Sequence, residues 1–340
     1  MSYRVRIEAS GHQFDCHPEE TVLEAALRQG YALPYSCRSG ACGSCKGQLR
    51  SGQVEYKEET QALSAAELAS GMALLCRAHP KSDLEIVVRE VGAARDIPVK
   101  IMPCRVQKKE QLAADVVRIL LKLPKTERMQ FLAGQYIDIL LADGRRRSFS
   151  LANAPHADEF LELHIRFVAG GEFTQVVFDE MQEKALLRIE GPLGGFFLHD
   201  TSTRPIIFVA GGTGFAPVKS MLEHLFSLDT RRPLHFYWGA RDLESLYMRK
   251  LPQKWAKQHQ NFHFVPVLSE PKPEDKWRGR TGFVHHAVVA DFKNLTDFDV
   301  YSCGPPAMVK AAYQELTTQG LPETQYFSDA FEFAKDKHKT

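Results

Sequence analysis

The sequence predicts a multidomain protein of mixed class, with an α+β part followed by an α/β part. The chain has 340 residues, enough for two or three domains that each bury a core. Its middle alternates apolar strands with turn residues, which favours a small antiparallel β-barrel. Its last third alternates strands with helices, the pattern of a parallel α/β sheet. We therefore expect three domains, at residues 1–95, 99–202 and 203–340.

Charge and composition exclude several classes of function. Lys and Arg number 43 against 42 Asp and Glu, a formal net charge of +1, so no basic nucleic-acid footprint is present. No stretch reaches the length of a membrane span, and the N-terminal run MSYRVRIEAS lacks the apolar core of a signal peptide. We expect no nucleic-acid partner, no membrane partner, and a soluble protein of a reducing compartment, the cytoplasm.

The N-terminal region shows strand and helix signals around a cysteine-rich loop. The first residues alternate apolar with charged side chains, which predicts a half-buried strand. Thr21 and Glu24 form the capping-box pattern of a helix that Gly30 ends. A second helix-like run covers 63–71, and a strand is predicted over 84–91.

Four cysteines carry the most specific signal in the chain. Their spacing is C-x4-C-x2-C…C, the ligand arrangement of a plant-type [2Fe–2S] cluster. Small residues between them let the backbone wrap closely around sulfur and donate N–H groups. A zinc site usually pairs two C-x2-C knuckles, and disulfide frameworks suit small secreted chains, so both alternatives are less favoured. The predicted cluster ligands are Cys37, Cys42, Cys45 and Cys76.

The first ninety or so residues resemble the plant-type ferredoxin domain, which has a β-grasp fold. The resemblance rests on the four cysteines, the glycines around them and the flanking order of strand and helix. It implies that Cys37 and Cys42 hold one iron and that Cys45 and Cys76 hold the other.

The middle segment contains Arg147-Ser148-Phe149-Ser150, which resembles the R-x-[YF]-[ST] signature of the ferredoxin–NADP reductase superfamily. The barrel of that superfamily binds FAD. The resemblance implies that the Arg147 guanidinium pairs with the flavin pyrophosphate, that Phe149 packs on the ring system, and that the catalytic Ser150 hydroxyl lies by flavin N5. A second flavin segment and the turn GPLGGFF at 191–197 follow in family order. The FAD-binding residues implied by this second segment are His164, Arg166, Gly171, Phe173 and Thr174.

Residues 205–226 indicate a buried strand, a glycine turn and a helix, a geometry that presents backbone N–H groups to phosphate. The run GGTGFAP resembles the superfamily turn that lies beneath a nicotinamide dinucleotide. A second strand at 234–241 and a CGPP turn at 303–306 follow. The resemblance implies that Cys303 lines the hydride-transfer site as a packing and positioning group, without covalent chemistry. The dinucleotide-binding residues implied are Gly212, Thr213, Gly214, Pro217, Arg241, Cys303, Gly304 and Pro305.

The C-terminal run YFSDAFEFA resembles superfamily endings of the form aromatic-x-[DE]-x-F. This resemblance implies that Asp329 and Phe331 approach the flavin. Phe331 is the candidate that covers the nicotinamide side of the ring, and Phe327 is the competing candidate.

The residues that follow the second strand bear on the choice of nucleotide. Arg241 could bind a 2′-phosphate, whereas Asp242 and Glu244 would repel it and suit a ribose diol. We therefore expect NADH as the donor, with NADPH less favoured.

The histidines share no metal-ligand spacing along the chain. His285 and His286 lie in the run GFVHHAVVADF, which is typical of an ordinary strand or helix edge. We expect no metal site from this pair.

The layout of the whole chain resembles the electron-transfer components of bacterial oxygenases and the CDP-6-deoxy-Δ3,4-glucoseen reductases. The run at 145–155, the N-terminal cluster domain and the YFSDAF ending are closest to the second group. The resemblance implies an NAD(P)H-dependent reductase that moves electrons from NADH through FAD and a [2Fe–2S] cluster to an oxygenase or dehydrase component. Two alternatives stay open: a redox-sensing or binding module, and a free flavin reductase in which the cluster is a spectator.

Overall fold

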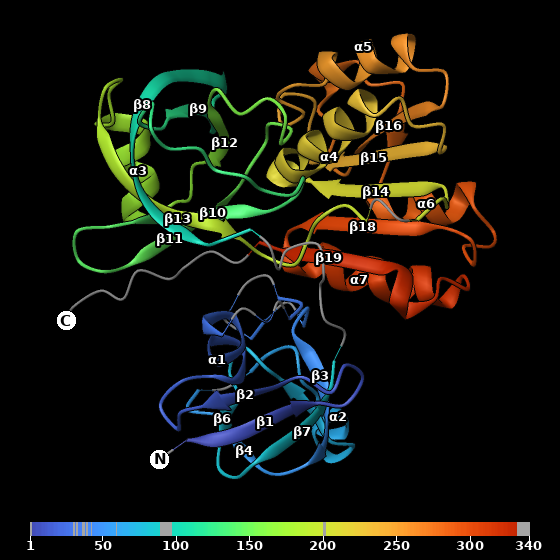
Figure 1. Ribbon diagram of the computed structural model, residues 1–340. Helices are drawn as coiled ribbons and strands as arrows, with labels where there is room; N and C mark the ends of the chain where they lie inside the picture. The colour runs from blue at the N-terminus through green and yellow to red at the C-terminus, as the bar shows by residue number, and fades with distance from the viewer. Residues whose placement is uncertain are drawn as a thin grey trace. The chain divides into compact units, whose positions relative to one another are not determined.

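The chain divides into two compact units, residues 1–98 with 194–196 and residues 99–193 with 197–340 (Figure 1). The computed structural model describes residues 2–29, 31, 33–35, 38, 40–41, 43–58, 60–88, 97–199 and 202–331.

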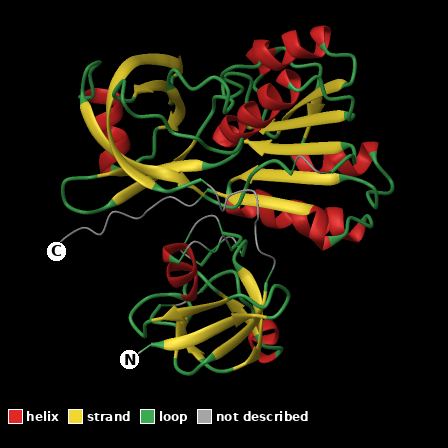
Figure 2. Ribbon diagram, in the orientation of Figure 1, coloured by secondary structure: helices red, strands yellow, loops and turns green. Residues whose placement is uncertain are grey.

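The first unit is a five-stranded mixed sheet with a helix packed on it (Figure 2). The strand order is β2-β1-β7-β3-β5, in which β1 pairs antiparallel with β2 and parallel with β7. The strands are β1 (Tyr3–Ile7), β2 (Gln13–Cys16), β3 (Lys46–Ser51), β5 (Met72–Leu74) and β7 (Leu84–Val87), and a separate ribbon pairs β4 (Val54–Glu55) with β6 (His79–Pro80). This mixed sheet confirms the predicted β-grasp domain. The predicted strand over 84–91 is shorter in the structure, and residues 89–91 lie outside the described part.

Both helices of this unit begin where the sequence predicts. At α1 (Val22–Arg28), the Thr21 side chain accepts from the Glu24 amide and the Glu24 carboxylate accepts from the Thr21 amide. The short α2 (Ala65–Ala69) has the same capping box at Ser64. Such reciprocal bonds satisfy amides that a helix end leaves unpaired. The predicted helix stop, Gly30, lies outside the described residues.

The first part of the second unit is an antiparallel barrel. Its strand order is β11-β10-β13-β8-β9-β12, and an antiparallel bridge from Leu151 to Leu163 joins the two end strands. The interior is apolar, and α3 (Glu172–Asp179) turns Phe173 and Val177 into it. The strands are β8 (Lys100–Ala113), β9 (Val116–Lys122), β10 (Tyr136–Leu140), β11 (Arg146–Ser150), β12 (Leu161–Arg166) and β13 (Leu186–Leu193).

The rest of the second unit is a parallel α/β sheet of order β17-β16-β15-β14-β18-β19. Tyr237 and neighbouring apolar residues on one face pack against α6 and α7, while Trp238 on the other face stacks on Phe215 of α4 (Figure 1). The strands are β14 (Ile206–Gly211), β15 (Leu234–Ala240), β16 (Phe262–Leu268), β17 (Arg280–Thr281), β18 (Asp299–Gly304) and β19 (Tyr326–Ala330). The α-helices are α4 (Phe215–Ser227), α5 (Lys250–Gln258), α6 (Val284–Asp291) and α7 (Pro306–Thr318).

The order of the parallel strands positions the site. From β14 the chain adds β15 and β16 on one side, and β18 and β19 lie on the other. The carboxyl ends of β14 and β18 therefore flank a topological switch point, where open α/β sheets bind their ligands. Both predicted dinucleotide turns follow these two strands.

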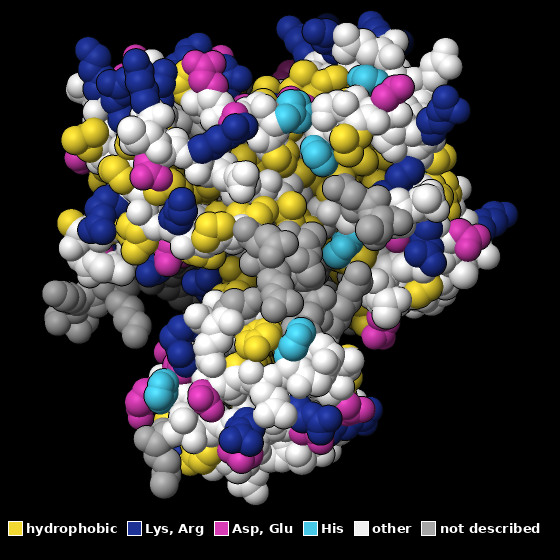
Figure 3. All heavy atoms as spheres, in the orientation of Figure 1, with side chains coloured by type: hydrophobic (Ala, Val, Ile, Leu, Met, Phe, Trp, Pro, Cys, Tyr) yellow, Lys and Arg dark blue, Asp and Glu magenta, His cyan; other side chains and the backbone are white. Residues whose placement is uncertain are grey.

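The surface agrees with the balanced composition. On the face seen in Figure 3, basic and acidic side chains are interspersed over most of the surface, and basic side chains gather at the upper left. None of the helices in the described ranges combines the length and apolar composition that a membrane crossing requires.

Candidate functional site

Two of the four predicted cluster ligands meet in the first unit. The Sγ atoms of Cys45 and Cys76 lie 3.1 Å apart, and both residues are buried. The backbone holds them together, because the Leu75 amide donates to the Cys45 carbonyl at 3.1 Å. Two sulfurs this close can bind one iron. Cys37 and Cys42 lie outside the described residues.

The described part of the cysteine loop is tightly packed. Gly40 and Gly43 have φ of +84° and +77°, which favours glycine. A Cβ on Gly40 would lie 3.0 Å from Cγ of Arg77 and 3.4 Å from Cγ2 of Thr60. The Ala62 amide donates to the Gly40 carbonyl at 3.1 Å. The segment around Thr60 thus packs on the loop, as close wrapping around a cluster requires.

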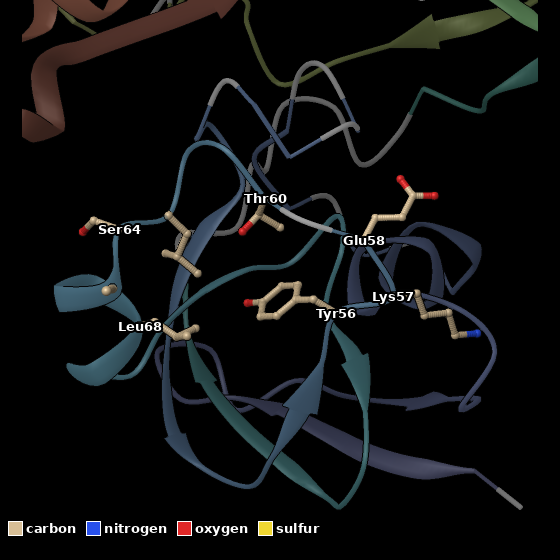
Figure 4. Close-up of a pocket in the computed structure, with 8 residues that line it drawn as sticks. Tyr56, Lys57, Glu58, Thr60, Ser64 and Leu68 are labelled. Atoms are coloured by element: carbon tan, nitrogen blue, oxygen red, sulfur yellow. The ribbon is translucent and has the colours of Figure 1, made fainter. Parts of the chain in front are cut away.

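A pocket of about 390 Å³ lies in the same unit (Figure 4). The Tyr56 hydroxyl accepts from the Leu74 amide at 3.1 Å, so this side chain is held in place. The lining includes no cysteine or histidine; it consists of Tyr56, Lys57, Glu58, Thr60, Leu63, Ser64, Ala65 and Leu68.

The predicted flavin signature forms the edge strand β11 of the barrel. The Ser148 hydroxyl donates to Asp138 of β10 at 2.6 Å. Arg147 is half-buried and donates from Nη1 to the Arg146 carbonyl at 2.9 Å. Ser150 ends the strand beside the barrel closure.

The second predicted flavin segment turns into α3 next to β11. The Thr174 hydroxyl accepts from the Val168 amide at 3.1 Å and lies 3.0 Å from the Gly171 carbonyl. An ion pair of 2.6 Å between Arg145 and Glu172 joins the two flavin segments. Thr174 therefore shapes the turn that leads into α3 with its side chain.

The Phe173 ring belongs to the barrel core, with its centroid 5.8 Å from that of Phe149. Phe149 is partly buried, and its ring packs against the barrel core. The pair gives β11 a rigid aromatic support, as the predicted role of Phe149 against a flavin requires.

His164 lies in a buried polar network. Its Nε2 is 2.8 Å from Oε1 of Glu162, and its Nδ1 is 3.0 Å from the Tyr247 hydroxyl. The second Glu162 oxygen is 3.2 Å from Nζ of Lys219 in α4, which also donates to the Ala152 carbonyl at 3.0 Å. Both ring nitrogens of His164 are thus engaged within the chain, and the side chain joins the barrel to the α/β sheet.

Burial and charge fix the protonation of this network. Burial opposes ionisation of Glu162, but the hydrogen bond from His164 and the charge of Lys219 outweigh it and lower the pKa of Glu162 to about 2. Burial lowers the pKa of His164 below its ordinary value, although Glu162 opposes this shift. At neutral pH a neutral imidazole therefore lies beside a charged pair.

The two dinucleotide turns pack backbone against backbone. A Cβ on Gly214 would lie 2.3 Å from the Cys303 carbonyl oxygen, and Gly304 has φ of +137°. The Trp238 indole donates to the Gly212 carbonyl at 2.9 Å and fixes the first turn. Only glycine fits where the backbones approach as closely as they do at Gly214 and Gly304.

The other predicted dinucleotide residues lie in the same two turns. Thr213 lies in the 3-10 turn Gly212–Gly214, Pro217 lies in the first turn of α4, and Pro305 caps α7.

Cys303 is fully buried between these turns, and its thiol donates to the Gly214 carbonyl at 3.0 Å. Burial raises the pKa of this thiol well above its ordinary value, and the charge of Asp329 adds to the shift. A buried, protonated thiol is a poor nucleophile. The arrangement suits the predicted packing role.

Arg166 brings unsatisfied donors to the dinucleotide turn. Nη1 pairs with Asp115 at 2.5 Å, while Nε and Nη2 are buried with no hydrogen-bond partner among the described residues. A Cβ on Gly212 would lie 3.6 Å from Nη2. A buried unpaired donor costs about 1–3 kcal/mol, so an oxygen atom of a bound nucleotide would be stabilised here.

The C-terminal strand lies beside the CGPP turn. Asp329 pairs with Cys303 in the sheet, and the Phe331 amide donates to the Gly304 carbonyl at 2.8 Å. Phe327 instead stacks on Tyr301, with ring centroids 4.8 Å apart. The backbone of Phe331 thus lies at the CGPP turn, whereas Phe327 lies further back along the sheet, beside Tyr301.

At the predicted ribose end, the Asp242 carboxylate is not free. It pairs with Nζ of Lys272 at 2.6 Å and accepts from the amide and hydroxyl of Ser245. The hydrogen bonds from Lys272 and Ser245 lower the pKa of Asp242 to about 2. Arg241 is exposed directly before it.

Sequence reasoning missed four of these polar residues: Glu162, Lys219, Tyr247 and Lys272. A signal existed for Lys219, a single cation among the apolar residues that begin α4, with Glu223 one turn later. A signal existed for Glu162 as well, because it lies two residues before His164 on one strand and therefore on the same face. No sequence spacing relates Tyr247 and Lys272 to the motifs.

Comparisons with known proteins match each part of the chain. Residues 5–81 match the 2Fe-2S iron-sulfur cluster binding domain, 103–198 the oxidoreductase FAD-binding domain, and 208–314 the oxidoreductase NAD-binding domain.

The chain is also similar to whole reductases. It is 43% identical to the CDP-6-deoxy-L-threo-D-glycero-4-hexulose-3-dehydrase reductase of Yersinia pestis, over 97% of this chain and 99% of that protein. It is 35% identical to reductase component 1 of the terephthalate 1,2-dioxygenase of Comamonas sp., over 97% and 98%. The crystal structure of the Amycolatopsis cytochrome P450 reductase GcoB superposes with a TM-score of 0.79 at 34% identity, over 97% and 98%. The chain belongs to the family of iron–sulfur flavoprotein reductases that join a 2Fe-2S cluster domain to an FAD-binding and an NAD-binding domain.

Proposed function

We propose that this reductase takes electrons from NADH and delivers them to a separate dehydrase component that acts on a nucleotide-linked deoxyhexose. The observation that carries the proposal is the 43% identity over 97% of the chain to a CDP-hexulose dehydrase reductase. The oxygenase reductases are also similar over the whole chain, at 35% for the terephthalate enzyme. An oxygenase is therefore the second candidate acceptor.

We assign the site residues to three tasks. The flavin is held by Arg147, Ser148, Phe149, Ser150, Arg166, Gly171, Phe173, Thr174 and the backbone at His164, with Asp329 and Phe331 beside it. The nicotinamide dinucleotide is held by Gly212, Thr213, Gly214, Pro217, Arg241, Cys303, Gly304 and Pro305. The cluster is held by Cys37, Cys42, Cys45 and Cys76.

The groups of the chain itself bind the two nucleotides and orient them for hydride transfer. Backbone N–H groups at the turns after β14 and before α3 suit phosphate oxygens. Ser150 offers a hydroxyl at the end of β11, where a hydrogen bond can hold a proton close to the hydride acceptor. When bound, FAD accepts two electrons as hydride and releases them singly, which matches a cluster that carries one at a time.

The choice of NADH rests on charge. Asp242 carries a negative charge at neutral pH, and hydrogen bonds from Lys272 and Ser245 lower its pKa further, to about 2. Glu244 lies two residues further on. Together they place negative charge where a 2′-phosphate would lie, although Lys272 offsets part of it.

The test is reconstitution with candidate acceptors. Purified reductase is mixed with NADH and either a CDP-6-deoxy-hexulose-3-dehydrase or a terephthalate dioxygenase, and product is measured. Faster turnover with the dehydrase supports the proposal, and turnover with the dioxygenase alone contradicts it.

A variant of the cluster separates the alternative functions. Cys42→Ser should abolish transfer to the acceptor protein but leave NADH-driven reduction of ferricyanide, which flavin can perform. Full-rate transfer by this variant would support a free flavin reductase, and no steady turnover in the native protein would support a redox sensor. We further propose that residues 38–44 form part of the acceptor-docking face, because electrons leave near the cluster.

We place the protein in the cytoplasm and its domains at residues 1–95, 99–202 and 203–340. The buried thiols of Cys16, Cys104 and Cys303 are free, in keeping with a reducing compartment.

A further inference from the structure

Outside the site, α6 and α7 bring together three side chains that can bind a metal. His285 and His286 lie in the first turn of α6, and Glu315 lies near the end of α7. The two helices contact each other on one face of the parallel sheet (Figure 1). The Nε2 atoms of His285 and His286 lie 3.4 Å and 3.1 Å from Oε1 of Glu315. All three ligand atoms lie within 4.8 Å of one another.

The two histidine-to-glutamate separations match those between neighbouring ligands of one metal ion. Zinc bonds to imidazole nitrogen and carboxylate oxygen of about 2.0–2.2 Å, arranged as a tetrahedron, place neighbouring ligand atoms about 3.3–3.6 Å apart. Both histidine-to-glutamate distances fall within a few tenths of an ångström of this range. The ligand atoms of the two imidazoles lie within 4.8 Å of each other, and the exposed His286 ring can move towards a cation shared by all three groups.

The burial of the three groups suits an open site. The side chain of His285 is 6% exposed, whereas those of His286 and Glu315 are 57% and 39% exposed. One ligand is therefore fixed by packing, and the other two leave a path from solvent. Three protein ligands leave the remaining positions of a divalent cation to water.

The sequence could not predict this cluster. Adjacent residues on a helix point about 100° apart, so a His-His pair alone does not converge on one ion. The convergence depends on Glu315, which lies 29 residues after His286 and on another helix.

We propose that His285, His286 and Glu315 bind a divalent transition-metal ion of the Zn²⁺ or Cu²⁺ class, separate from the iron–sulfur cluster. Imidazole with a carboxylate is a ligand set that both ions accept. The ion would tie the first turn of α6 to α7. This first turn of α6 packs closely on β15, because a Cβ on Gly239 near the end of β15 would lie 2.9 Å from Cβ of Val284.

The test is a zinc titration of the tag-free holoprotein by calorimetry, with iron counted before and after to show that the cluster is intact. Wild type, His286→Gln and Glu315→Gln are compared, with His263→Gln, an exposed histidine of β16, as the control. We expect one site in wild type and in the control, and a more than tenfold higher Kd in the other two variants, the effect of losing one ligand. Both variants change exposed side chains, so their folding should be unaffected.

A second readout uses copper. One equivalent of Cu²⁺ should give an EPR spectrum with nitrogen hyperfine structure from the two imidazoles, and His286→Gln should reduce it to one nitrogen. Equal zinc affinity in all four proteins, or the absence of zinc binding in wild type, would overturn the proposal.

Discussion

Cys303 and Ser150, the two residues predicted to lie where hydride is transferred, differ in burial and in their hydrogen bonds. The Cys303 thiol is buried and bonded to the Gly214 carbonyl at 3.0 Å, so it fixes two turns against each other. Ser150 is only partly buried and ends an edge strand, so its hydroxyl is available to a ligand. Of the two, Ser150 is the residue that we propose to act on a proton.

Ser150→Ala should slow flavin reduction at saturating NADH by about tenfold, the worth of one hydrogen bond of about 1.4 kcal/mol. Stopped-flow absorbance of the flavin under anaerobic conditions measures this rate. Ser150→Thr keeps the hydroxyl and should retain most of the rate. An alanine variant as fast as wild type would remove the role proposed for this side chain.

Asp242→Ser should lower the preference for NADH over NADPH. The change removes one negative charge and frees Lys272, which now pairs with Asp242 at 2.6 Å, to bind a 2′-phosphate. We expect the ratio of kcat/KM values to fall by about tenfold, equal to about 1.4 kcal/mol. Lys272→Gln is the matched control and should raise the ratio. An unchanged ratio in both variants would show that nucleotide choice lies elsewhere.

At the scale of elements, the link between α4 and the barrel was hidden from the sequence. The glycine turn before α4 and the strand β12 are each predictable from local patterns. That Lys219 of α4 would reach Glu162 of β12 and the Ala152 carbonyl was not, because the contacts join residues 57 and 67 positions apart. Local sequence patterns predict the elements and their ends, whereas contacts between elements depend on how those elements pack against one another.

Lys219→Met should destabilise the second unit, because it leaves the charge of Glu162 buried without its cation. Removing one partner of a buried pair costs about 3–5 kcal/mol. Urea unfolding followed by flavin fluorescence measures the loss, and the same variant should slow flavin reduction at saturating NADH. Lys219 holds α4 against the residues that follow the flavin strand, so both readouts should change together.

Glu223→Gln is the matched control for this pair. Glu223 also contacts Lys219, at 3.0 Å, but its side chain is 27% exposed, and such a pair contributes about 1 kcal/mol or less. Adding Glu162→Gln to Lys219→Met should recover part of the lost stability. If Lys219→Met matches wild type in both stability and flavin reduction, the contacts of Lys219 with Glu162 and Ala152 do not hold α4 against the barrel.

At the scale of the whole molecule, motifs in a fixed order made the architecture predictable. The cysteine spacing, the RSFS run and the GGTG turn each mark a binding surface for a cofactor, and such surfaces tolerate few sequences. The ribose end was less predictable, because the Asp242 charge is partly neutralised by Lys272 from a loop thirty residues away. The site proposed at His285 likewise depends on Glu315, 29 residues after His286 and on another helix.

Stability of the second unit should fall as pH drops from 6.5 towards 4. Burial lowers the pKa of His235 to about 4, and the neighbouring His263 adds to the shift, while burial also lowers the pKa of His164. In this window the unfolded chain binds protons that the folded chain does not, so acid favours unfolding. The pKa of Glu162 is lowered from 4.5 to about 2, so the stability that its charge provides is lost only as the pH falls below about 4.5.

Urea unfolding at pH 7 and pH 5 tests this dependence. Wild type should be less stable at pH 5, and His235→Phe, which keeps an aromatic ring against Phe292, should show a smaller difference. Equal stability of wild type at the two pH values would contradict the assignment of neutral buried histidines.

We propose that electrons follow a single path from nicotinamide through flavin to the cluster. An anaerobic titration with NADH, followed by visible absorbance and low-temperature EPR, tests this path. We predict bleaching of the flavin absorption together with a rhombic [2Fe–2S] signal. Flavin bleaching without a cluster signal, or no response from either group, would contradict the path.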